Sequence, residues 1–177
     1  MDTGTHLAAD SRAAGRPPHS SLRAAACAAA GWATAFSLIH LYWLLGGRIG
    51  LPAGLAVRDN TPLLVIDVLS IPLCAVAAVL ALALVRPWGA RLPAGLLTVG
   101  ARGTAALLLL HAAPSVPDWV ALAAGARTTS DLDAMGRFAT FLYEPFFMAG
   151  GLLFALASLA VRGQFRFARF GKSRSGA

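Results

Sequence analysis

The chain has 177 residues, of which 57% are hydrophobic and only 13% are charged, whereas about a quarter of the residues of an ordinary soluble domain are charged. This composition excludes a conventional soluble catalytic domain and favours an integral membrane protein. The formal net charge of +7 does not indicate nucleic-acid binding, because the basic residues flank apolar stretches instead of forming a compact basic domain.

Four long apolar stretches follow one another along the chain. A hydrocarbon core about 30 Å thick is crossed by roughly 20 helical residues, so each stretch is long enough to span a membrane. The sequence therefore predicts an all-α, polytopic integral membrane protein folded as an antiparallel four-transmembrane-helix bundle. The predicted spans cover residues 24–45, 62–85, 92–113 and 138–161.

Glycine and proline residues mark the connections between these spans. Gly46-Gly47 ends the first span, Pro62 opens the second, and Pro87 lies in a short turn before the third. The connection before the fourth span is the longest. Its residues 118–126 are expected to form a short helix at the outer surface, with Trp119 at the membrane interface.

The basic residues predict the orientation, because Lys and Arg accumulate on the cytoplasmic side of membrane spans. Residues 1–23 are expected to be a disordered cytoplasmic tail, and residues 163–177 a basic cytoplasmic tail. Both termini are therefore predicted to be cytoplasmic. The basic residues assigned to that side are Arg12, Arg16, Arg23, Arg86, Arg91, Arg162, Arg166, Arg169, Lys172 and Arg174.

Ionisable residues interrupt the spans in the halves predicted to face outward. A charge near the bilayer centre costs at least about 2.5–3.5 kcal/mol, so such residues are usually paired, hydrated or functional. At about 1.5 Å per helical residue, His40, Asp67 and Glu144 lie at a similar depth, and Arg102 is deeper with a side chain long enough to reach them. We expect Arg102 to pair with Asp67, Glu144 or both. These four residues are the candidates for binding a proton or a small solute, and the alternative is that they only hold the helices together.

Aromatic residues accompany this cluster. Tyr42, Trp43 and Tyr143 are expected to lie in the aromatic belt at the membrane interface. His40 and His111 fall in the outer halves of two predicted helices, so axial ligation of one haem b by both is a further alternative.

Motifs that carry enzymatic chemistry are not visible in the sequence. Cys27 and Cys74 are far apart and form no C-x-x-C pair, and the chain has no Gly-rich phosphate loop or zinc signature. We therefore expect no catalytic residue, no metal and no cofactor, and a non-enzymatic protein. Its expected partners are the lipid bilayer and either a membrane protein or further copies of the chain. An accessory-subunit role, with packing through residues 24–31 and 150–151, is the alternative.

Three short segments of the sequence resemble a known family. They are the string from His40 to Gly47, the intramembrane Arg102, and Phe138 followed by Tyr143-Glu144-Pro145. Together they resemble the bacterial family of small four-helix membrane proteins catalogued as domain of unknown function 3995, over residues 31–161. The resemblance implies a four-span protein and no particular reaction. The preference for Arg over Lys and the abundant Ala and Gly favour a bacterial plasma membrane protein.

Overall fold

The computed structural model describes residues 19–160, and every regular element in that part of the chain is helical. Four helices there are long and apolar enough to cross a membrane: 20–44, 61–83, 94–123 and 134–158. The long helices are α2 (His19–Leu44), α3 (Thr61–Ala83), α4 (Ala94–Ala112) and α7 (Glu144–Ser158). The shorter elements are η1 (Val57–Asp59), η2 (Pro87–Arg91), η3 (Ala113–Ser115), α5 (Val116–Ala123), η4 (Thr129–Asp131), α6 (Ala134–Phe138) and η5 (Ala139–Tyr143).

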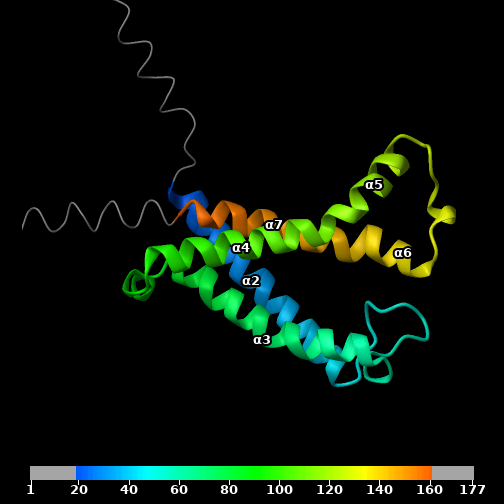
Figure 1. The fold of residues 1–177 in the computed structure, drawn as a ribbon, viewed down its shortest axis with the longest axis horizontal. Coiled ribbons are helices and arrows are strands. Elements are labelled where there is room, and N and C mark those ends of the chain that lie inside the picture. Colours follow the sequence, from blue (N-terminus) through cyan, green and yellow to red (C-terminus); the bar gives the residue numbers. More distant parts are fainter. Residues whose placement is uncertain (1–18, 161–177) are drawn as a thin grey trace, which may run out of the picture.

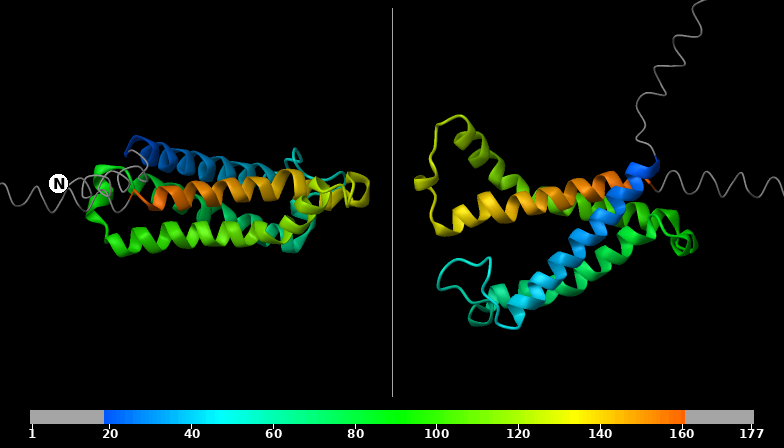
Figure 2. Two further views of the ribbon diagram at one scale, coloured as in Figure 1. Left: turned by 90° about the horizontal axis from the view of Figure 1, so that it is seen from above. Right: turned by 180° about the vertical axis from the view of Figure 1, so that it is seen from behind.

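The long helices form two pairs that meet at one end and diverge toward the other (Figure 1). Helix α2 lies beside α3, and α4 lies beside α7. The view from behind in Figure 2 shows the same arrangement, with the short turn between α3 and α4 at the closed end. The connections from α2 to α3 and from α5 to α6 therefore lie at the open end of the molecule.

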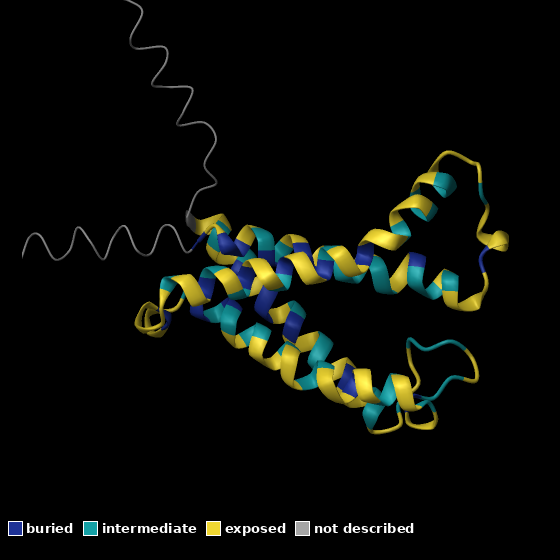
Figure 3. Ribbon diagram, in the orientation of Figure 1, coloured by how far each residue is buried: buried dark blue, intermediate teal, exposed yellow. Residues whose placement is uncertain are grey.

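The core lies where the two helix pairs meet, as the buried segments in Figure 3 show. It consists mainly of alanine side chains, which allow helix backbones to approach closely. The larger side chains that complete it are Leu84, Leu97, Leu108 and Phe154.

Two adjacent glycines of α7 fix its contacts with the neighbouring helices. A Cβ at Gly150 would lie 2.4 Å from Cε2 of Trp32 on α2, and a Cβ at Gly151 would lie 2.7 Å from Cγ of Leu109 on α4. Both glycines are buried. The expectation that this pair packs against another protein is therefore wrong, because its space is already filled from within the chain.

The ends of the helices follow local sequence signals. The side chain of Asn60 accepts a hydrogen bond from the backbone N–H of Leu63, 3.2 Å away, at the start of α3, where Pro62 occupies the first turn. Helix α2 begins at His19, so the last residues of the predicted disordered tail are helical. The remainder of that tail and the predicted basic tail lie outside the described residues.

The predicted short helix in the long connection is present with different bounds. Helix α5 starts two residues earlier than predicted and follows α4 through the single turn η3. Continuous helical geometry through this turn explains the shift, because Pro114 and Pro117 both lie in first turns, where a missing N–H is tolerated.

Candidate functional site

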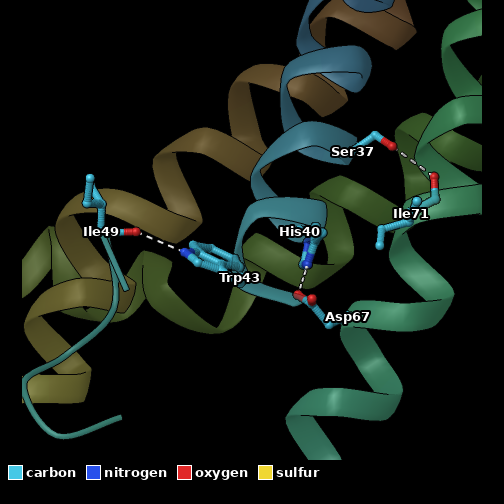
Figure 4. A network of polar contacts seen from close by, with 6 residues as sticks. All are labelled: Ser37, His40, Trp43, Ile49, Asp67 and Ile71. Atoms are coloured by element: carbon cyan, nitrogen blue, oxygen red, sulfur yellow. Dashed lines mark hydrogen bonds and ion pairs between the residues drawn. The ribbon is translucent and has the colours of Figure 1, made fainter. Parts of the chain in front are cut away.

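His40 of α2 and Asp67 of α3 form a buried pair near the open end of the molecule (Figure 4). The distance between His40 Nδ1 and Asp67 Oδ1 is 2.5 Å, and their side chains are only 8% and 3% exposed. An ionised carboxylate only accepts hydrogen bonds, so Nδ1 carries the hydrogen when Asp67 is charged. His40 is then either a neutral imidazole with an acceptor at Nε2 or an imidazolium with a donor there.

A second polar contact joins the same two helices one turn further along. Ser37 Oγ donates a hydrogen bond to the backbone oxygen of Ile71, at 3.0 Å (Figure 4). Ser37 and His40 therefore hold α2 and α3 in one register, and this fixes the geometry of the His40–Asp67 pair.

The buried pair is incompletely hydrogen-bonded. Within residues 19–160, the His40 Nε2, Asp67 Oδ2 and Glu144 Oε2 atoms are buried and have no hydrogen-bond partner. Leaving a buried polar group unsatisfied costs about 1–3 kcal/mol, and more for a charged group. A purely structural contact between α2 and α3 does not require the free positions at His40 Nε2 and Asp67 Oδ2.

The second helix pair carries a looser histidine–carboxylate pair. His111 Nε2 of α4 lies 3.8 Å from Glu144 Oε1 of α7, and the two side chains are 54% and 14% exposed. This separation is too long for a hydrogen bond. The two side chains form an ion pair only when His111 is protonated. His111 is thus the exposed member of the second pair.

Aromatic rings connect the two pairs. Phe36 lies with its centroid 4.4 Å from the His40 ring and 5.2 Å from the Phe147 ring, and Phe147 lies 4.0 Å from the His111 ring. We call His40, Asp67, His111, Glu144 and these two phenylalanines the polar–aromatic layer. The two imidazoles contact Phe36 and Phe147 instead of facing each other, so the geometry does not favour the alternative of one haem held by both.

The predicted pairing of Arg102 is wrong. Within residues 19–160, ion pairs join His40 to Asp67, His111 to Glu144, and Arg127 to Asp118. Arg102 belongs to none of these pairs, and its side chain is exposed. The depth of Arg102 along α4 would allow the predicted pairing, but its direction around the helix axis does not. Ala101 and Ala105 face the core, and Arg102 is rotated by about 100° from Ala101, so its side chain points away from the core.

The aromatic residues assigned to the interface bind the connection after α2. Trp43 Nε1 donates to the backbone oxygen of Ile49 at 2.8 Å, and Tyr143 Oη donates to that of Gly50 at 2.6 Å. Tyr42 Oη accepts from the backbone N–H of Arg48 at 3.3 Å. Tyr143 belongs to η5, so this contact ties the connection to the opposite helix pair; the position of the three rings in a membrane interface stays a prediction.

The close packing of Tyr42 explains why a glycine stands at Gly47, within the segment from His40 to Gly47 noted in the sequence. A Cβ at Gly47 would lie 2.2 Å from Cζ of Tyr42. Only glycine leaves room for this ring, so Tyr42 and Gly47 form one structural unit.

A short π-helix precedes Glu144. In this register the N–H of Glu144 donates to the oxygen of Ala139, five residues earlier, and the next residue, Pro145, has no N–H for the oxygen of Thr140. Trp119 Nε1 of α5 donates to that oxygen instead, at 2.7 Å. Trp119 thereby fixes α5 against the segment that positions Glu144.

Sequence reasoning missed the phenylalanines and the pairing of His111 with Glu144. Residues three or four apart lie on one face of a helix, so Phe36 is expected beside His40, and Phe147 beside Glu144. This helical periodicity is the sequence signal from which both phenylalanines could have been predicted. The contact of Phe36 with Phe147 joins residues far apart in the sequence, and no local pattern predicts it.

The four apolar helices and their buried titratable residues define a multi-pass membrane protein. The family model described as "Protein of unknown function (DUF3995)" matches residues 33–154, and the chain belongs to this family. The matched range contains both histidine–carboxylate pairs and confirms the resemblance noted in the sequence. No curated protein and no solved structure matches the chain.

Proposed function

We propose that this chain is a non-enzymatic protein of the bacterial plasma membrane that binds a proton at the His40–Asp67 pair from the outer side. The observation that carries the proposal is the burial of this pair together with its unpartnered Nε2 and Oδ2 atoms. Imidazole is the side chain whose charge ordinarily changes between about pH 5 and 8. Protonation of His40 places a positive charge beside the buried Asp67 carboxylate and offsets its desolvation.

The proposed topology places both termini in the cytoplasm and the four spans in alternating directions. Ten of the fifteen basic residues lie in the segments assigned to the cytoplasm, and this asymmetry supports the orientation. The open end of the molecule, which contains the connections after α2 and after α5, then faces outward. His40 and His111 both lie toward that end.

The groups around the pair determine its charge balance. His40 comes from α2 and Asp67 from α3, while α4 contributes His111 and α7 contributes Glu144. With both histidines neutral, two carboxylates face this layer without a partnered cation among residues 19–160. Uptake of a proton reduces that excess of negative charge.

The test is a nitrogen-15 NMR titration of the histidine side chains in the purified full chain, reconstituted in lipid nanodiscs. His40→Gln and His111→Gln assign the two signals. We expect the His40 nitrogens to titrate, with the midpoint displaced in Asp67→Asn and unchanged in the control Asp118→Asn. A His40 signal that keeps one protonation state between about pH 4 and 9 would refute proton binding at this pair.

A second candidate function is that of a subunit in a membrane complex, and the exposed Arg102 favours it. This cation lies within a span, where an unpaired charge is costly. A Cβ at the nearby Gly95 or Gly103 would meet no atom within 4 Å, which leaves the surface open to close approach by another helix. If a stoichiometric partner copurifies, Arg102→Leu is expected to lose it and Arg91→Leu to retain it; equal retention contradicts this role of Arg102.

A further inference from the structure

We infer that the connection after α2 is a strap that closes the way from the open end of the molecule to the His40–Asp67 pair, and that Tyr143 of the opposite helix pair holds it shut. We call residues 45–56, which lead from the end of α2 to η1, the α2–α3 strap. The inference rests on the proposed function, because the strap controls access to the same pair. It concerns the route by which a proton reaches His40.

The pair has to exchange protons with water although it is buried. The side chains of His40 and Asp67 are only 8% and 3% exposed. Among residues 19–160, Nε2 of His40 has no hydrogen-bond partner, so no described group relays a proton to this nitrogen. Exchange with water then requires a local opening of the structure. An element that lies next to His40 therefore has to move.

Trp43 is the side chain that lies between the strap and His40 (Figure 4). Its ring meets the His40 ring edge-on, with the two centroids 5.3 Å apart. Its Nε1 donates a hydrogen bond to the backbone oxygen of Ile49 in the strap, at 2.8 Å, so the position of the ring depends on the strap. Movement of the strap frees Trp43 to leave the His40 ring.

Hydrogen bonds from both helix pairs hold the middle of the strap. Tyr143 Oη of η5 donates to the backbone oxygen of Gly50, at 2.6 Å. Tyr42 Oη of α2 accepts from the backbone N–H of Ile49, at 3.4 Å. Gly50 has a φ of +84°, which residues with a side chain rarely adopt, so the backbone bends at the residue that Tyr143 holds. Tyr143 is thus the tie that comes from the helix pair opposite His40.

Apolar burial holds the strap only weakly. None of residues 45–56 is buried, and Leu45 and Ile49 are 73% and 81% exposed. Val57, which follows the strap at the start of η1, is buried and fixes its far end. A segment with few buried apolar contacts opens locally at a low free energy, so its hydrogen bonds decide how often it opens. Loss of the bond from Tyr143 is therefore expected to make opening more frequent.

The test measures how fast diethyl pyrocarbonate, which acylates neutral imidazole, modifies His40 in the full chain in lipid nanodiscs at about pH 8. Mass spectrometry gives the rate, and the exposed His111 is the internal reference. Tyr143→Phe keeps the ring and removes the donor to the strap. We expect it to raise the rate at His40 about three- to tenfold, as the loss of one hydrogen bond does in an opening equilibrium.

Two further variants accompany this measurement. Trp43→Phe removes the donor to the backbone oxygen of Ile49 and is expected to raise the rate in the same direction. Ser158→Ala is the matched control, because its hydroxyl bonds within α7, to the oxygen of Ala155, and its loss is expected to leave the rate unchanged. If Tyr143→Phe does not fold, Trp43→Phe carries the test, and an unchanged rate at His40 overturns the inference.

Hydrogen exchange of the backbone amides of residues 46–51 reports whether the strap itself has loosened. If this exchange accelerates in Tyr143→Phe while the His40 rate stays the same, the strap does not cover the pair and the inference is wrong. If neither changes, Tyr143 does not hold the strap and the inference is equally wrong.

The NMR titration separates this inference from proton binding. If His40 titrates but its modification rate is the same in Tyr143→Phe as in the wild type, the strap is wrong and proton binding stands. If His40 keeps one protonation state and Tyr143→Phe still raises its modification rate, proton binding is wrong and the strap stands.

Discussion

Asp67 shows at the residue scale how a carboxylate is kept within an apolar helix. Its side chain is 3% exposed and its described partner is one imidazole nitrogen. Removing one member of a buried ion pair leaves the other charge without compensation, whereas replacing both by apolar residues is often tolerated. The His40–Asp67 pair therefore has a testable energetic signature that differs from that of an ordinary surface contact.

We predict that His40→Leu destabilises the protein by about 3–5 kcal/mol, because it leaves Asp67 buried without a partner. The double substitution His40→Leu with Asp67→Leu is expected to be closer to wild type in free energy of unfolding. Reversible unfolding in mixed detergent, followed by circular dichroism, measures both. A double variant less stable than His40→Leu would contradict the pairing.

Arg102 leads to the opposite expectation. Because the side chain is exposed and pairs with neither Asp67 nor Glu144, Arg102→Leu is predicted to change the stability of the isolated protein in detergent by no more than about 0.5 kcal/mol. The same unfolding measurement applies. A loss of several kcal/mol would show that Arg102 supports the polar cluster, as the sequence alone led us to expect.

Small residues determine how the helices approach at the scale of elements. Gly150 accommodates Trp32, whose Nε1 donates to the backbone oxygen of Phe146 at 3.0 Å. Gly31 is the contrasting case, since a Cβ there would meet no atom within 4 Å. The two glycines belong to long helices and differ in what surrounds them.

We predict that Gly150→Ala destabilises the protein by about 1–3 kcal/mol, because its Cβ would overlap the Trp32 ring. Gly31→Ala is the matched control and is expected to be neutral or stabilising by up to about 1 kcal/mol, since alanine is the better helix former. Thermal unfolding of both variants in one detergent checks this. Equal effects of the two changes would rule out the packing role of Gly150.

The π-helix provides a second prediction for an element. Trp119→Phe keeps an aromatic ring and removes the donor to the buried Thr140 oxygen, so a loss of about 1–3 kcal/mol is expected. In the same variant, the backbone amides of residues 116–123, which form α5, should exchange their hydrogens faster than in the wild type. Trp88→Phe, an exposed tryptophan in the turn η2, serves as the control. Unchanged exchange in Trp119→Phe would mean that other contacts hold α5.

The turn at η4 is expected to respond to acid. Hydrogen bonds from the backbone and side chain of Thr128, followed by the charge of Arg127, lower the pKa of Asp131. Its contribution to the turn is therefore complete above the unfolded pKa near 3.8 and is lost as the pH falls through the lower folded value. The NMR signal of the Thr128 backbone amide, which donates to Asp131, should shift as the Asp131 carboxylate is protonated. Persistence of the same signal in Asp131→Ala at neutral pH would contradict the capping role.

The sequence predicts the architecture of the whole molecule better than it predicts the site. Span length, proline and glycine punctuation and composition are local properties, and they were sufficient for the helical fold and its four candidate spans. Depth along each helix also placed His40 and Asp67 at a common level, and these two residues do form a pair. Rotation about the helix axis depends on contacts between distant residues, such as Gly151 with Leu109, so the pairing of Arg102 was predicted wrongly.

The shape of the molecule relates the two histidine–carboxylate pairs to each other. We call the helix pairs α2–α3 and α4–α7 the two arms of the molecule. Each histidine–carboxylate pair joins the two helices of one arm, and the Phe36–Phe147 contact lies between the arms. Tyr143 additionally links the α4–α7 arm to the connection of the α2–α3 arm through Gly50. The proton proposed to bind at His40 would therefore lie close to the contacts that hold the two arms together.

The most direct test of the account is a pH change imposed on one side of the membrane. The full chain is reconstituted in vesicles with both termini facing the lumen, an orientation verified by protease protection, and the His40 side-chain nitrogens are followed by NMR. We predict that His40 responds to the pH of the external bath and not to that of the lumen. A response to the lumen alone, or to neither side, would contradict proton binding from the outer face.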